Sequence, residues 1–291
     1  MGAKHFTIQK KLVCGLIAAG ILFYAFIACL FYTVFQVTGH FLEQQSSPKT
    51  VLTEGLNKQV YENFRIYYAE EEKALVDLTI EGLEQAKKRN SSVFQFETKK
   101  TLDLIFFDDK ETIEHYAGIK NITGFYSDKD RMIGLYPDER SELLKKETLS
   151  FYFFKNLLTH EFAHFVFYEK LRTLHVSPAA FPLWFHEGTA EWAANDVLHA
   201  TSETFDVIPF TLLQTDKDWQ ESRFAYETDV YLQSYYMLCE LNHAYGRDII
   251  AKVIEETAKT GDFEKGFEHA SGQKLADFEE QFRQKYERKN G

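Results

Sequence analysis

The sequence of 291 residues is poor in cysteine, proline and glycine, with 3 Cys, 5 Pro and 15 Gly. So little proline and glycine argues against long disordered or low-complexity segments. Cys14 and Cys29 both lie in one apolar run, which leaves Cys239 as the only cysteine in the rest of the chain. The part of the chain beyond that run therefore cannot form an internal disulfide, and its fold cannot depend on one.

Basic residues are outnumbered, with 33 Lys and Arg against 44 Asp and Glu, and the formal net charge is −11. This balance excludes sequence-independent nucleic-acid binding as a favoured function, because such binding needs Lys and Arg to displace counterions. Aromatic residues are abundant, with 27 Phe and 16 Tyr, and they can build a packed interior. The length suits one medium domain or two small ones.

One long apolar run stands near the N-terminus, at residues 12–35, and contains 24 residues without a charge. As a helix it would be about 36 Å long, enough to cross about 30 Å of hydrocarbon. We therefore predict a transmembrane signal anchor over residues 12–37. Two alternatives are a cleavable signal peptide and a lipoprotein-like box at Phe26–Cys29, although the run is long for the first and continues past the cysteine of the second.

Charges beside the run set the expected orientation. Lys4, Lys10 and Lys11 precede it, whereas Glu43 is the only charged residue between positions 38 and 48. The positive-inside rule then predicts a cytoplasmic N-terminus at residues 1–11 and an extracytoplasmic remainder. The expected localisation is the cell membrane of a bacterium, with a single span.

Beyond a polar linker at residues 38–55, we predict one domain over residues 56–291. The pattern indicates a long helix at about 60–88, a strand at 101–107, a short helix, and two strands in "TGFYS" and "RMIGLYP". The remainder reads as mostly helical, with a loop at 171–181 and an irregular segment at 200–226. Strands before helices predict the α+β class with segregated layers. The predicted helices are at 149–170, 182–199, 227–245, 247–259 and 274–288.

The stretch "LLTHEFAHFVFYEK" carries two histidines at helical spacing. Residues i and i+4 lie on one helix face, so His160 and His164 can reach one ion about 2.0–2.1 Å from their nitrogens. Glu161 is turned by about 100° and can take a proton from water at that ion. The alternative is an apolar helix that carries two histidines by coincidence.

A catalytic zinc site needs a third protein ligand. The metzincin pattern would place a histidine at position 170, which is Lys170, so this pattern is excluded. Downstream, Glu187 and Glu191 lie four residues apart in "FPLWFHEGTAEWAAND" and share a helix face. One can bind the metal while the other accepts the free N–H of a ligating histidine.

We prefer Glu187 as the third ligand. His186 and His175 are the competing candidates; the first points away from Glu187 and the second lies in a predicted loop. The alternative for Glu191 is a solvated surface carboxylate.

These motifs resemble those of gluzincins, the metallopeptidase clan that includes thermolysin and the aminopeptidase-N group. More closely, the chain is similar to the small bacterial domains called peptidase MA-like. The likeness covers about residues 100–288 and rests on the HExxH helix, on "LWFHEGTAEW" and on a final helical part that begins with "YLQSYYMLCELNHAYG".

The resemblance implies a zincin-like metallopeptidase domain: an N-terminal helix and a small sheet, then a mainly helical C-terminal lobe, all after the transmembrane helix. It further implies that His160, His164 and Glu187 bind zinc, that Glu161 is the general base, and that Glu191 supports a histidine ligand. Tyr231 takes the place of the tyrosine that steadies the oxyanion, with Tyr226 and Tyr235 as rivals.

The chain departs from the aminopeptidase-N group in two respects. It lacks the "GxMEN" strand, and "RMIGLYPDE" stands where that edge strand is expected. It also lacks the large N-terminal sheet domain. Both departures favour an endopeptidase, or an enzyme of unknown cleavage mode. An edge strand could still bind a peptide by backbone pairing.

The sequence therefore predicts a membrane-anchored zinc metallopeptidase. It would hydrolyse peptide bonds with water that Glu161 activates at Zn²⁺. The expected partners are a peptide or protein substrate and the membrane, but no nucleic acid. The alternative is a non-catalytic zinc-binding extracytoplasmic domain that acts as a sensor or scaffold, and a domain without metal is a further rival.

Overall fold

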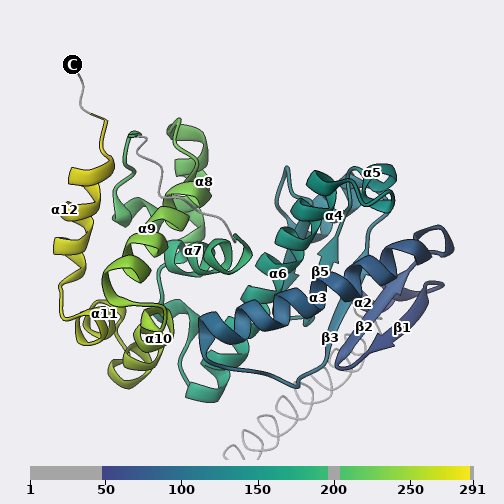
Figure 1. Ribbon diagram of the computed structural model, residues 1–291, viewed down its shortest axis with the longest axis horizontal. Coiled ribbons are helices and arrows are strands. Elements are labelled where there is room, and N and C mark those ends of the chain that lie inside the picture. The colour runs from purple at the N-terminus through teal and green to yellow at the C-terminus, as the bar shows by residue number, and fades with distance from the viewer. Residues whose placement is uncertain (1–47, 196–203, 289–291) are drawn as a thin grey trace, which may run out of the picture. The chain divides into compact units, whose positions relative to one another are not determined.

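The computed structural model describes residues 48–195 and 204–288. The chain divides into two units, residues 1–54 and residues 55–291 (Figure 1). In the first unit the described part holds only the short helix α2 (Pro48–Thr53). The predicted cytoplasmic segment 1–11 and transmembrane segment 12–37 lie outside the described residues.

The described residues do not supply a membrane anchor. None of the helices within 48–195 and 204–288 is both long enough and apolar enough to cross a bilayer. The predicted fold class and the predicted membrane localisation are corrected to this extent: the described part of the chain holds no transmembrane helix.

Five strands form one mixed sheet in the second unit, in the order β1-β2-β3-β5-β4. β2, β3 and β5 run parallel, whereas β1 and β4 are antiparallel to their neighbours. The predicted strands 101–107, "TGFYS" and "RMIGLYP" are confirmed as β3, β4 and β5, but β4 and not β5 forms the edge. The bounds are β1 Asn57–Tyr61, β2 Phe64–Tyr68, β3 Leu102–Phe106, β4 Gly124–Ser127 and β5 Met132–Leu135.

The first two strands contradict the predicted N-terminal helix at 60–88. Phe64 and Ile66 are fully buried while the residues between and after them are partly exposed, the period-two pattern of a strand. Arg65 on β2 pairs with the buried Asp103 on β3 and secures the parallel register. The helix α3 (Lys73–Phe94) begins only after this hairpin.

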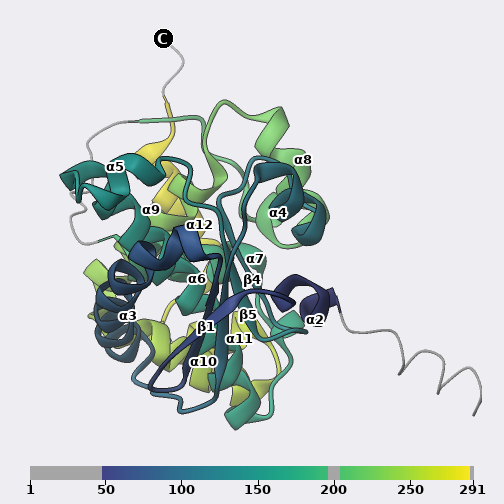
Figure 2. The same cartoon turned by 90° about the vertical axis from the view of Figure 1, so that its right-hand side faces the viewer.

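Helix α3 connects β2 to the parallel strand β3, and it packs along α6 (Thr148–Leu174). The layers are therefore not fully segregated, because a β-α-β crossover opens the domain. Figure 2 shows α3 beside the sheet, with α6 behind it. Helix α6, which carries His160 and His164, is thus packed against both α3 and the sheet.

The C-terminal part of the domain is helical, and α7 lies near its centre (Figure 1). The predicted helices correspond to α6, α7, α9, α10 and α12. Helix α8 was missed in the segment expected to be irregular, and α11 was not separated from its neighbours. The remaining bounds are η1 Glu70–Glu72, α4 Lys110–Ala117, α5 Arg140–Leu144, η2 Pro178–Ala180, α7 Leu183–Ala194, η3 Phe210–Leu213, α8 Asp216–Ala225, α9 Val230–Tyr245, α10 Ile249–Thr260, α11 Phe263–Ser271 and α12 Leu275–Tyr286.

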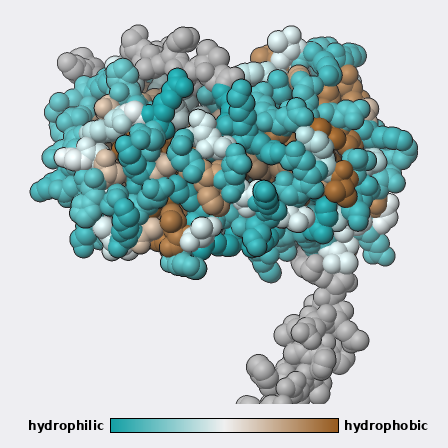
Figure 3. Space-filling view, turned by 60° about the horizontal axis from the view of Figure 1, so that its bottom comes forward, coloured by the Kyte–Doolittle hydropathy of each residue, from teal (hydrophilic) through white to brown (hydrophobic). Residues whose placement is uncertain are grey.

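Aromatic packing fixes the position of α7. Trp184 is almost fully buried and its ring contacts Phe185, Phe210 and Phe263. On another side of α7, Gly188 lets α9 approach closely, since a Cβ there would lie 2.6 Å from the backbone oxygen of Ser234. Many apolar side chains therefore lie in the interior. The face shown in Figure 3 is mostly hydrophilic, with small and separate hydrophobic patches.

Candidate metal centre

The two histidines of α6 converge on one point. Their Nε2 atoms lie 3.1 Å apart, and the ring centroids are 4.9 Å apart. Both histidines belong to this one apolar helix, and the residues beside them in the sequence, Phe162, Ala163 and Phe165, are buried. Two imidazole nitrogens at this distance need a proton or a cation between them, because facing lone pairs repel.

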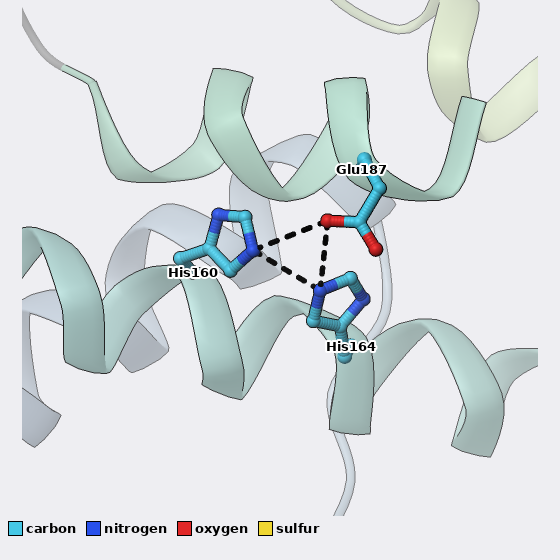
Figure 4. A group of neighbouring side chains, drawn as sticks. All are labelled: His160, His164 and Glu187. Atoms are coloured by element: carbon cyan, nitrogen blue, oxygen red, sulfur yellow. Dashed lines mark hydrogen bonds and ion pairs between the residues drawn. The ribbon is translucent and has the colours of Figure 1, made fainter. Parts of the chain in front are cut away.

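Glu187 on α7 completes a triangle with these nitrogens (Figure 4). Its Oε2 atom lies 3.5 Å from His160 Nε2 and 3.6 Å from His164 Nε2. In a tetrahedral zinc site with ligands about 2.0–2.1 Å from the ion, ligand atoms lie roughly 3.3–3.4 Å apart. The three residues therefore fit a zinc ion without rearrangement, and they are the one group of this kind found among the described residues.

Glu191 lies one turn further along α7 and contacts the far side of the His160 ring. Its Oε1 is 3.1 Å from Nδ1 of His160, while its Oε2 accepts a hydrogen bond from the Asn195 side chain at 2.9 Å. With Nδ1–H directed at the carboxylate, Nε2 of His160 is left free to face the cluster. The structure thus brings Glu187 and Glu191 to the two positions that the sequence predicted for them.

Glu161 is 6 % exposed and follows His160 on the same helix. Burial raises the pKa of its carboxyl, against the opposing influence of His160 and His164. A carboxylate with a raised pKa accepts a proton more readily than an exposed one. The environment of Glu161 therefore suits a base.

Mutual pairing compensates the other buried charges of the cluster. Burial opposes the charged form of His160, but Glu191 and Glu187 outweigh burial and the pKa of His160 is raised. For Glu187, burial is outweighed by His164 and His160, so its pKa is lowered. Burial likewise raises the pKa of Glu191, but His160 outweighs it and the net pKa is lowered.

Tyr231 stands in the first turn of α9, where the Asp229 side chain caps the helix. Its ring packs edge-to-face on Trp219, at 5.1 Å between centroids, and the guanidinium of Arg223 lies 5.7 Å from its ring centre. Burial and the charge of Glu187 raise the pKa of its phenol. Trp219 and Arg223 are neighbours that the sequence reading missed, because α8 itself was missed.

Tyr235 lies one turn along α9 and packs against Trp192, with a buried hydroxyl. Tyr226 ends α8 as its C-cap. Burial raises the pKa of both Tyr231 and Tyr235, and the charge of Glu187 adds to it for Tyr231, as that of Glu191 does for Tyr235. The role of Tyr231 in catalysis stays a prediction.

Neither rival histidine joins the cluster. His186 is buried against Phe167, with ring centroids 4.5 Å apart, and its Nε2 lies 3.3 Å from the carbonyl oxygen of Pro178. His175 is exposed and caps the C-terminal end of α6 with a left-handed backbone, at φ 56°. Sequence reasoning also missed Asn195, the C-cap of α7, although its position four residues after Glu191 pointed to it.

Comparisons with known proteins find similarity both in sequence and in structure. The chain is 45% identical over 240 residues to the uncharacterized protein YhcO of Bacillus subtilis (strain 168), covering 82% of this chain and 74% of that protein. It is also similar to the crystal structure of Legionella pneumophila aminopeptidase A in complex with aspartic acid, at a TM-score of 0.49 and 13% identity. That similarity covers 80% of this chain but only 28% of the aminopeptidase chain. No family model matches the sequence.

Proposed function

The chain belongs to the family of the Bacillus subtilis protein YhcO, and from the geometry of its metal centre we propose that it is a zinc-dependent peptidase of the gluzincin type. The observation that carries the proposal is the triangle of His160, His164 and Glu187, whose sides match those of a tetrahedral zinc site. Bound zinc would supply a Lewis acid for the carbonyl of the substrate and lower the pKa of water.

The protein side chains have separate tasks in this proposal. Glu161 accepts a proton from the attacking water and delivers it to the leaving amine. Glu191 orients His160 through its Nδ1–H. Tyr231 donates a hydrogen bond to the oxyanion that develops on the carbonyl. A buried carboxylate, a positioned histidine and a nearby phenol together support hydrolysis rather than simple metal storage.

The sheet supports a peptide as the substrate. β4 is the edge of the described sheet, and it packs on the metal-binding helix α6. Contact between them is close, because a Cβ on Gly124 would lie 2.8 Å from Leu157, which is three residues before His160. An extended peptide could pair with the free backbone edge of β4 while its scissile bond lies over the cluster.

The test compares the wild type with Glu161→Gln and with the control Glu111→Gln, which changes an exposed carboxylate on α4. We expect all three proteins to hold about one zinc per chain by elemental analysis. Cleavage of a diverse peptide library, followed by mass spectrometry, should fall by about 10²- to 10⁴-fold in Glu161→Gln alone.

Two outcomes would refute the proposal in different ways. Substoichiometric zinc that added metal does not restore would remove the metal centre. Full zinc in a wild type that cleaves no peptide would favour the non-catalytic zinc-binding domain instead.

A further inference from the structure

A second hollow of about 960 Å³ lies between α3, α7, α9 and α12, apart from the three metal ligands. We call it the basic groove, and its lining includes Lys88, Arg89, Trp192, Asn242, Arg247 and Lys285. Its volume is at the upper end of what small-molecule sites reach, roughly 300–1,000 Å³. The groove is open as well as large, so it suits an extended occupant better than a compact one.

Cations dominate the groove, although the whole chain carries a net charge of −11. Lys88 and Arg247 are exposed, and neither has an acidic partner within residues 48–195 and 204–288. Lys285 donates to Glu240, the single carboxylate among the described residues that line the groove. The local excess of positive charge makes an anionic occupant favourable.

Buried polar atoms in the groove wall lack good partners. Asn242 is 7 % exposed, and its side-chain nitrogen donates to the carbonyl oxygen of Leu238 while its side-chain oxygen has no partner. Tyr235 is 2 % exposed, and its hydroxyl faces only the thiol of Cys239, a weak partner. These buried atoms cost stability, but they lie beneath the surface of the groove, so the charged side chains are the groups that an occupant would contact.

These features distinguish among anions. A compact phosphate is commonly held at a helix N-terminus by backbone N–H groups. The groove is lined instead by the C-terminal halves of α3, α7 and α9 and by Lys285 in the last turn of α12. At the end of α7, the carbonyls of Ala193 and Ala194 accept from Arg89 at 3.0 and 2.9 Å. Such a wall offers a carboxylate separate side-chain cations rather than a cradle of backbone N–H groups.

We propose that the basic groove binds an acidic peptide segment. Carboxylates of the peptide contact Lys88 and Arg247, two exposed cations of the groove. The groove also reaches the metal centre, since Asn195 lines it and donates to Glu191, which holds His160. A bound acidic segment would therefore be connected to His160 through the hydrogen bonds of Asn195 and Glu191.

Fluorescence anisotropy with the full chain tests the proposal. The probes are a labelled peptide that alternates Glu and Gly, and the same peptide with Gln or Lys in place of Glu. We expect the Glu peptide alone to bind, and its affinity to fall as salt is raised. The double variant Lys88→Glu/Arg247→Glu should weaken binding by about tenfold or more, because charge-assisted contacts become repulsive. Lys88→Gln/Arg247→Gln should give a smaller loss.

A matched control separates local from general electrostatics. Lys58→Glu/Lys120→Glu makes the same change of net charge at exposed sites outside the groove, and we expect less than a twofold change there. Circular dichroism checks that all variants fold. Glu161→Gln should bind the Glu peptide as the wild type does, so that this test is independent of catalysis.

Three results would overturn the proposal. The first is equal binding of the Glu and Gln peptides, and the second is equal loss in the groove variant and the control. The third is displacement of the peptide by millimolar inorganic phosphate at constant ionic strength, which would assign the groove to a compact anion.

Discussion

Helix α7 contributes to two regions with opposite electrostatics. Toward α6 it presents Glu187 and Glu191, which lie within 3.6 Å of histidine nitrogens. At its C-terminal end Trp192 and Asn195 line the basic groove, where exposed cations gather. The metal cluster is compact, mostly shielded from solvent and compensated in charge, whereas the basic groove is open and carries uncompensated charge.

This difference predicts how strongly each region responds to amino-acid substitution. Buried charges that depend on one another are costly to separate, because removing one partner leaves another buried and unpaired. An exposed cation without an acidic partner costs little free energy, because water solvates its charge. Substitutions in the metal cluster should therefore have large and specific effects, and those in the groove should have graded effects that depend on salt.

Removal of a metal ligand should give the largest effect. His164→Gln keeps much of the side-chain volume but replaces the imidazole, so we expect bound zinc and peptide cleavage to fall to background. Binding of the acidic peptide should stay unchanged, because His164 does not line the groove. Elemental analysis and the anisotropy assay measure the two sites separately.

His175→Asn is the matched control for that ligand variant. His175 is exposed and has a left-handed backbone, which Asn tolerates. Zinc content should match the wild type. If His164→Gln kept a full complement of zinc, the histidine would not be a ligand and the geometric argument would fail.

Substitution of two tyrosines that lie one turn apart on α9 should separate the metal cluster from the basic groove in function. Tyr231→Phe removes a phenol beside the metal cluster, and we expect kcat to fall by about 10²- to 10³-fold with zinc retained. Tyr235→Phe removes a hydroxyl that lies among groove residues, and kcat should change less than about threefold. Steady-state cleavage of one good library peptide distinguishes them. Equal kcat values for the two variants would exclude Tyr231 from oxyanion stabilisation.

Removal of the carboxylate that contacts His160 should reduce zinc affinity moderately. Glu191→Gln removes the negative charge that faces Nδ1 at 3.1 Å, and zinc affinity should fall by about tenfold. Competition with a chromophoric chelator measures the affinity. Glu227→Gln, at an exposed position, serves as the control. An unchanged affinity in Glu191→Gln would mean that Asn195 and packing orient the histidine without the charge.

The metal cluster could be predicted from sequence because helical periodicity is local. His160 and His164, like Glu187 and Glu191, are pairs four residues apart, and one helix turn brings each pair to a common face. Only the approach of the two helices had to be inferred. Strands β3, β4 and β5 were similarly clear from short apolar runs bounded by turn residues.

Features that depend on long-range contacts could not be predicted. Residues 60–68 were read as part of a helix, because their strand character shows only when Phe64 and Ile66 are buried against β3. The basic groove draws Lys88 from α3, Arg247 from beyond α9 and Lys285 from α12. No spacing in the sequence relates these cations, since tertiary packing alone brings them together.

The thiol of Cys239 gives the smallest expected effect and tests how tightly the groove wall is packed. Burial raises the pKa of this thiol from 9.0 to about 12, so at pH 8 it holds about a thousandfold less thiolate than an ordinary cysteine. We expect iodoacetamide to label Cys239 very slowly in the folded protein and rapidly in urea, as peptide mapping would show. Cys239→Ala should leave zinc content and peptide cleavage unchanged. Rapid labelling of the folded protein would mean that this wall opens to solvent, and that Tyr235 and Asn242 are hydrated rather than held without partners.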